Sequence, residues 1–159
     1  MIDGHGRNID YLRISLIDRC NLRCVYCMPE DGVDMVPHEE ILTYEEVLRL
    51  VKVFANLGFR KIKLTGGEPL VRKEVVKLVR EIKAIPGIEK VTLTTNGTLL
   101  ADVMDELADA GIDGINLSLD TLNPEVYKKI VRRDQFERVM EGFQAALKYP
   151  QIPLKVNCV

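Results

Sequence analysis

Segments typical of β-strands alternate with amphipathic helical segments along most of this 159-residue chain. Apolar runs with strand character cover residues 11–17, 61–65, 91–95, 114–119 and 153–159. The segments between them carry apolar residues at helical spacing, and the first helix opens on Thr43-Tyr44-Glu45-Glu46, the form of a capping box. Strands that alternate with helices are joined in parallel by right-handed crossovers, so the sequence predicts an α/β fold.

Polar residues occupy every second position of these strands and therefore share one face of the predicted sheet. They are Arg13 and Ser15, Lys61, Lys63 and Thr65, Thr92, Thr94 and Asn96, Asn116, Ser118 and Asp120, and Lys155 and Asn157. A sheet covered by helices on both faces would show apolar runs instead. We therefore expect a partial parallel (β/α) barrel of about five strands, with helices outside, a wet concave face and an open carboxyl-terminal edge. An antiparallel sheet with one solvated face is the alternative, but the long intervening helices argue against hairpins.

The polar face carries an excess of positive charge. Four cations lie on it, against the single acid Asp120: Arg13, Lys61, Lys63 and Lys155. Each alone is typical of a solvated surface, but four on one face predict an anionic ligand such as a phosphorylated molecule.

Three cysteines follow the first strand closely, as Cys20, Cys24 and Cys27 in a C-x3-C-x2-C pattern. Thiolates spaced this tightly suit a soft inorganic centre. Three ligands on a four-iron cluster leave one iron open to a small molecule, whereas a structural site normally closes its shell. Two alternatives remain: a zinc site completed by His5 or His38, and a disulfide with one spare thiol.

Charge and hydropathy argue against a protein that binds nucleic acid, is secreted or spans a membrane. With 22 Lys and Arg against 24 Asp and Glu, the net charge is −2, so no global charge attracts nucleic acid or an anionic membrane. The sequence shows no signal-peptide core and no apolar run long enough to span a membrane. We therefore expect one cytoplasmic domain over residues 1–159, in which cysteines are ligands rather than disulfides.

The cysteine motif, with Tyr26 before its last cysteine, resembles the cluster loop of radical S-adenosylmethionine (SAM) enzymes. The loop Gly66-Gly67-Glu68-Pro69, one strand later, strengthens the resemblance. It implies a 4Fe-4S cluster on Cys20, Cys24 and Cys27, with SAM chelating the open iron and the glycine loop holding the SAM amino group. The paired glycines would also let a ligand approach the backbone closely. In that family, reduction of SAM gives a 5′-deoxyadenosyl radical.

A closer resemblance is to the GTP 3′,8-cyclase family of molybdenum cofactor biosynthesis. The motifs that carry it are Gly6-Arg7, Leu12-Arg13-Ile14-Ser15, Asp18-Arg19-Cys20-Asn21, Tyr26-Cys27-Met28-Pro29, residues 61–70, Leu93-Thr94-Thr95-Asn96-Gly97, residues 116–120 and Lys155-Val156-Asn157. The resemblance implies SAM contacts at Tyr26, Gly66, Gly67, Glu68 and Ser118. It implies GTP contacts at Arg13, Lys63, Thr94 and Lys155.

The activity implied by this family converts GTP to (8S)-3′,8-cyclo-7,8-dihydroguanosine 5′-triphosphate. Its radical abstracts the ribose 3′ hydrogen, and the sugar carbon then attacks C8 of guanine. The implied partners are GTP, an electron donor and the next enzyme of the pathway, with a homodimer as a further expectation. Nucleic acid and membrane are not expected partners.

The sequence also departs from this family. Lys63 stands where an Arg is usual, and Ile17 where a Thr is usual. The family has three more cysteines that hold a second cluster, whereas Cys158 is the only cysteine here after Cys27 and is expected to be a small core residue. We therefore expect the amino-terminal, truncated portion of a longer enzyme, incomplete alone and prone to self-association through its open edge. The alternatives are another radical SAM enzyme, peptide-modifying or of the heme pathway, and a non-catalytic metal-binding scaffold.

Overall fold

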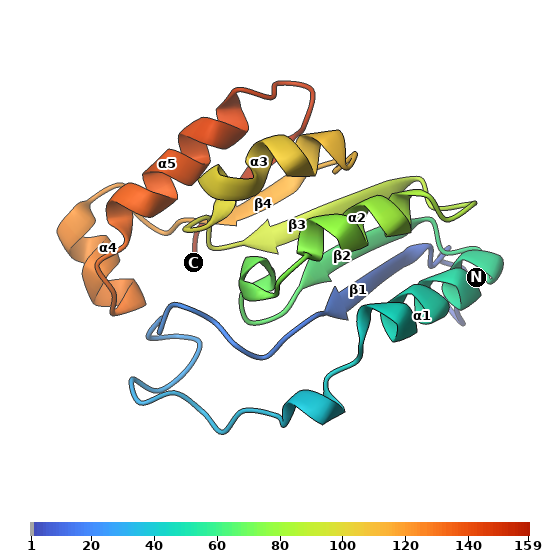
Figure 1. Ribbon diagram of the computed structural model, residues 1–159, viewed down its shortest axis with the longest axis horizontal. Coiled ribbons are helices and arrows are strands. Elements are labelled where there is room, and N and C mark those ends of the chain that lie inside the picture. Colours follow the sequence, from blue (N-terminus) through green and yellow to red (C-terminus); the bar gives the residue numbers. More distant parts are fainter. Residues whose placement is uncertain (1) are drawn as a thin grey trace.

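Five parallel strands form one sheet in the computed structural model, which describes residues 2–159 (Figure 1). Their bounds are β1 Tyr11–Ser15, β2 Lys61–Thr65, β3 Lys90–Thr95, β4 Ile115–Ser118 and β5 Leu154–Asn157. The spatial order β1-β2-β3-β4-β5 equals the order along the chain. Every predicted strand is confirmed, although the first and the last end two residues earlier than the sequence suggests.

Five α-helices connect these strands within the described residues. They are α1 Tyr44–Asn56, α2 Val75–Lys83, α3 Leu100–Asp109, α4 Pro124–Val131 and α5 Phe136–Leu147. The predicted capping box of α1 is formed, because Thr43 Oγ1 accepts from the Glu46 amide at 3.2 Å and Glu46 Oε2 from the Thr43 amide at 2.7 Å. None of the helices in residues 2–159 is long and apolar enough to cross a membrane.

The apolar sides of the strands form the core. Successive crossovers to neighbouring strands place the helices one after another around the outside of the sheet (Figure 1). Six residues on the helix-covered face of the strands are at most 1% exposed: Ile62, Leu64, Val91, Leu93, Ile115 and Leu117. The predicted alternation is thus confirmed, and the opposite face of the sheet is left free to carry polar groups.

Three local features do not follow from the sequence patterns. Val156 alternates with the polar residues of β5 but is 49% exposed, because β5 lies at the edge of the sheet. Two short 3-10 helices, η1 (His38–Glu40) and η2 (Pro69–Val71), gave no periodic signal because each has only three residues. Helix α2 has no side-chain cap: it follows Glu74, which has a left-handed backbone with φ 60°.

Candidate active site

The cysteine loop leaves the carboxyl end of β1 and is held by backbone hydrogen bonds on two sides. On one side, the amides of Gly67 and Glu68 donate to the carbonyls of Ile17 and Arg19, at 2.6 and 2.9 Å. On the other side, the amides of Arg23 and Val25 donate to Val131 and Ile130 at the end of α4, at 3.0 and 2.9 Å. The loop is thereby fixed between the β2 loop and α4, even though it has no regular secondary structure of its own.

The paired glycines after β2 are explained by this contact. A Cβ built on Gly66 would lie 2.5 Å from the Ile17 carbonyl oxygen, and one on Gly67 would lie 2.3 Å from the Arg19 carbonyl oxygen. Gly66 also has φ 150°, which few other residues adopt. The sequence suggested that these glycines admit a ligand. In the structure their missing side chains make room for the backbone of the cysteine loop.

Glu68 is a buried carboxylate that joins two loops. Its side chain accepts from the Thr95 hydroxyl at 2.7 Å, the Leu70 amide at 3.0 Å and the Asn96 amide at 2.7 Å. Glu68 is 1% exposed, and this burial raises its pKa, although the three donors oppose the rise. The backbone of Glu68 is extended, with φ −122°, as is usual for a residue that precedes a proline. Since these donors already engage both carboxylate oxygens, the geometry favours a bracing role for Glu68.

One cavity of about 310 Å³, which we call the rim cavity, lies at the carboxyl ends of the strands and is lined by the predicted cluster and SAM residues. It is lined by all three cysteines of the motif and, among others, by Tyr26, Gly66, Gly67, Glu68, Thr94 and Ser118. Asn96 and Asn157 also line it, and the sequence analysis had assigned neither of them to the site. Parallel strands bring their carboxyl ends to one edge, which explains how residues so distant in sequence meet here.

The three cysteines are chemically suited to an iron-sulfur cluster. Cys20, Cys24 and Cys27 are free thiols, with Cys27 exposed and the other two partly buried. Burial raises the pKa of Cys20, and it raises that of Cys24 to about 11, so iron would have to displace the proton. Within residues 2–159, no three His, Cys, Asp or Glu side chains converge on a single metal position. The three free thiols in this spacing suit a cluster, in which each thiolate would hold a different iron.

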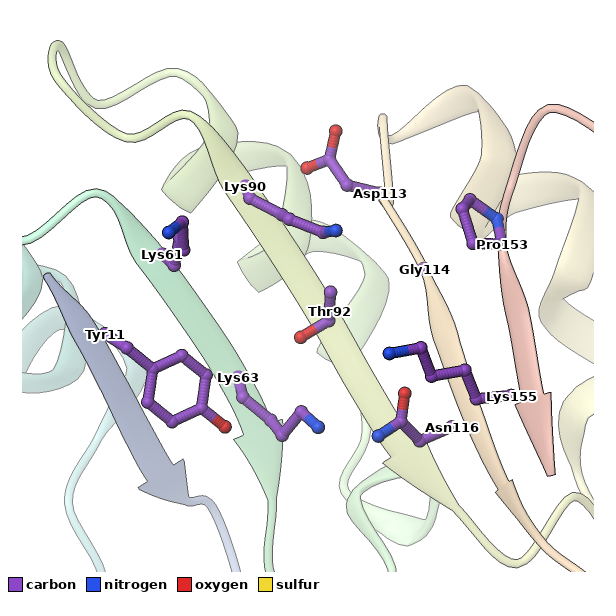
Figure 2. Close-up of a pocket in the computed structure, with 10 residues that line it drawn as sticks. All are labelled: Tyr11, Lys61, Lys63, Lys90, Thr92, Asp113, Gly114, Asn116, Pro153 and Lys155. Carbon is purple, nitrogen blue, oxygen red and sulfur yellow. The ribbon is translucent and has the colours of Figure 1, made fainter. Parts of the chain in front are cut away.

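A second hollow lies on the polar face of the sheet, toward the amino ends of the strands (Figure 2). Its lining includes Lys61, Lys63, Lys90, Thr92, Asn116 and Lys155. The strand register places three polar residues side by side on this face, because Thr94 pairs with Asn116 and Asn116 pairs with Lys155. Thr94 lines the first cavity, whereas Asn116 and Lys155 line the second, so the linings of the two hollows adjoin along this row.

The predicted cations differ in their pairing. Lys61 forms an ion pair with Asp10 at 2.9 Å, whereas no ion pair is formed by Lys63 or Lys155 within residues 2–159. Arg13 lies beside Lys63 in the register, one strand further out, and does not line the hollow. Lys90, which sequence reasoning missed because it begins a strand, adds a further cation to the hollow.

The expectation of a single acid on this face was wrong. Asp113 also lines the hollow, but its carboxylate is engaged by Lys83 Nζ and the Val91 amide, both at 2.7 Å. The hollow therefore keeps its positive character.

Asp120 lies at the other end of the polar face. It accepts from the Tyr26 hydroxyl at 2.7 Å, which fixes that side chain beside the cysteines.

Cys158 was expected in the core, and this was wrong. It is exposed, and its thiol donates to the Asp120 carbonyl at 3.1 Å.

The sequence profile of the radical SAM superfamily matches residues 14–159. The chain belongs to this superfamily. Solved structures agree with the fold. The alignment with anSMEcpe with bound AdoMet covers 93% of this radical SAM chain and 43% of that protein, with a TM-score of 0.73 and 23% identity. For HydG, a maturase of the FeFe hydrogenase, the TM-score is 0.71 at 18% identity, over 92% and 34% of the two chains. The predicted partial barrel of the radical SAM type is thus confirmed.

Among curated relatives, this radical SAM chain is 54% identical to a GTP 3′,8-cyclase of Syntrophomonas wolfei and 52% identical to one of Petrotoga mobilis. Both alignments cover all of this chain and 49% of the relative. Molybdenum cofactor biosynthesis protein 1 of Bos taurus is 49% identical over all of this chain and 25% of its own length. The chain therefore spans about half the length, or less, of the curated relatives it matches.

Proposed function

We propose that this chain binds one 4Fe-4S cluster through Cys20, Cys24 and Cys27, binds SAM at the open iron, and positions GTP for 3′,8-cyclisation. The observation that carries this proposal is the pair of adjoining hollows: a thiol-lined cavity at the rim and a lysine-lined one beside it. The bound cluster would supply the electron that cleaves SAM to a 5′-deoxyadenosyl radical. The similarity to GTP 3′,8-cyclases supports the choice of GTP.

The chain's own groups would bind and orient the reactants. Gly66, Gly67, Tyr26 and Ser118 line the rim cavity, where they would contact SAM beside the three thiolates. Thr94 lies where the linings of the two hollows adjoin, so it would contact the part of the nucleotide nearest to the reacting sugar. Holding both reactants in place lowers the barrier because little orientational freedom remains to be lost in the reaction.

The charge of the second hollow favours a triphosphate over a neutral substrate. Lys63 and Lys155 carry no ion pair within the described residues and line the same hollow, so a polyanionic ligand bound there could pair with both. A neutral peptide substrate would not need this arrangement, which weighs against a peptide-modifying activity. Reduction of the cluster would require a donor protein, and the product would pass to the next enzyme of molybdenum cofactor biosynthesis.

We expect Lys63→Ala to weaken GTP binding by about one to two decades, because a charge-assisted contact contributes roughly 1.5–3 kcal/mol. Lys63→Arg should keep or improve binding, since a guanidinium offers two parallel donors to phosphate. Isothermal titration of the reconstituted chain with GTP measures the effect. SAM cleavage should be unchanged in both variants because Lys63 lines the second hollow and not the rim cavity.

The matched control is Lys52→Ala, an exposed lysine on the outer side of α1, which should change GTP binding by no more than about 0.5 kcal/mol. Equal loss of affinity in Lys63→Ala and Lys52→Ala would contradict the substrate site.

The reaction itself is tested with GTP deuterated at the ribose C3′ position. Deuterium should appear in the 5′-deoxyadenosine that is formed, and unlabelled 5′-deoxyadenosine would contradict 3′ abstraction.

A further inference from the structure

Asn96 points its amide at one cysteine of the motif. Its Nδ2 lies 3.8 Å from Cys20 Sγ, and the Leu22 amide donates to the same sulfur at 3.4 Å. Within the described residues, these are the hydrogen bonds from backbone or amide groups to a sulfur of the motif. Asn96 comes from the end of β3, so this donor lies 76 positions away from Cys20 in the sequence.

The orientation of this amide is fixed by its neighbours. Asn96 Oδ1 accepts from the Thr98 backbone amide at 3.0 Å and from the Thr98 hydroxyl at 2.8 Å. A backbone amide can only donate, so the atom facing it must be the oxygen. Asn96 Nδ2 in turn donates to Asn21 Oδ1, and Asn21 Nδ2 donates to Thr98 Oγ1, both at 2.8 Å. This closed ring holds the NH2 group of Asn96 on the side of Cys20.

Tyr127 supplies a second polar group from α4. Its side chain packs in the same small core cluster as Cys20 and Cys24, and the residue is 2% exposed. Its hydroxyl is buried and has no hydrogen-bond partner within residues 2–159. A buried hydroxyl without a partner costs stability, about 1–3 kcal/mol, so such groups normally have one. A phenol ordinarily ionises near pH 10, so at neutral pH the Tyr127 hydroxyl carries its proton and can donate.

We propose that Asn96 and Tyr127 donate hydrogen bonds to the cluster held by the three cysteines and thereby raise its reduction potential. This inference rests on the proposed function, since it requires the cluster. Donors directed at thiolates or sulfides stabilise the more negative, reduced state more than the oxidised one, so they favour uptake of the electron. The bound cluster would also give the Tyr127 hydroxyl the acceptor that the protein alone does not offer it.

The test is an EPR-monitored redox titration of the anaerobically reconstituted chain. Tyr127→Phe removes only the hydroxyl and should lower the equilibrium constant for cluster reduction about three- to tenfold, or about 30–60 mV for a one-electron couple. Asn96→Ala should lower it in the same direction. In the iron-free chain, Tyr127→Phe should not lower the unfolding midpoint, because it deletes a hydroxyl that has no partner there. A purely structural role would not lower the potential while leaving the iron-free chain intact.

Two matched controls separate this effect from general changes. Tyr149→Phe removes a hydroxyl that bonds Asp105, on α3 and away from the cysteines, and Asn56→Ala removes an exposed amide at the end of α1. Both should leave the potential at the parent value. A parent potential in both Tyr127→Phe and Asn96→Ala would overturn the inference alone. A parent chain that assembles no iron-sulfur cluster would overturn the proposed function, and this inference with it.

Discussion

Cys24→Ala is expected to abolish reductive cleavage of SAM. Each of the three thiolates would hold one iron, so removal of one leaves an iron without its protein ligand and the cluster without its anchor. Cys24 lines the rim cavity, and the backbone of the neighbouring Arg23 and Val25 is bonded to the end of α4, which fixes the position of this cysteine. The measurement is 5′-deoxyadenosine formed from SAM under dithionite after anaerobic reconstitution, together with the iron and sulfide content.

Cys158→Ala is the matched control for this prediction. Cys158 is also a free cysteine, but it is exposed and its thiol donates to a backbone carbonyl of Asp120. Its removal should leave iron content and SAM cleavage close to those of the parent. Retained cleavage in Cys24→Ala would remove this cysteine from the cluster, and loss of iron in Cys158→Ala would add a ligand that we do not assign.

Glu68→Ala is expected to give the largest loss of stability, about 2–4 kcal/mol in the free energy of unfolding. The substitution leaves three donors without their acceptor: the Thr95 hydroxyl and the amides of Leu70 and Asn96. Each unsatisfied donor costs roughly 1–3 kcal/mol, partly offset because a buried carboxylate no longer has to be desolvated. Denaturant unfolding of the iron-free chain, followed by circular dichroism, measures the effect without any contribution from a cluster.

Two further variants test whether the loss of stability comes from the hydrogen bonds of Glu68. Glu106→Ala removes an exposed carboxylate on α3 and should stay within about 0.5 kcal/mol of the parent. Glu68→Gln should cost less than Glu68→Ala, because its remaining oxygen can still accept from one of the two loops. If Glu68→Ala unfolds at the parent denaturant concentration, Glu68 does not brace these loops, and a direct role in SAM binding regains support.

Much of the fold could be predicted because the deciding signals are local. Strand faces follow from a two-residue alternation, which is why Lys63 and Leu64 can be assigned to opposite faces from their sequence positions alone. The order of the strands follows from short right-handed crossovers. The thiol-lined cavity could likewise be predicted, since the carboxyl ends of parallel strands meet at one edge. The role of each residue that lines it stays a prediction.

The remaining features depend on contacts that no local pattern encodes. The glycines at 66 and 67 are required by the backbone of Ile17 and Arg19, some fifty residues earlier. Asn96 and Tyr127 approach the cysteines only because β3 and α4 end beside the cysteine loop, and neither residue belongs to a motif that names a donor. The exposure of Val156 and Cys158 reflects the position of β5 at the edge of the sheet, which the alternation of residues within one strand does not reveal.

The most direct test of the central claim is the formation of 5′-deoxyadenosine from SAM by the anaerobically reconstituted chain with dithionite. A chain that carries one cluster on three thiolates should hold about four irons and produce 5′-deoxyadenosine and methionine in equal amounts, and both should disappear when the reductant is withheld. A chain that holds one zinc ion instead, or that holds a full cluster and leaves SAM intact under dithionite, would contradict the account.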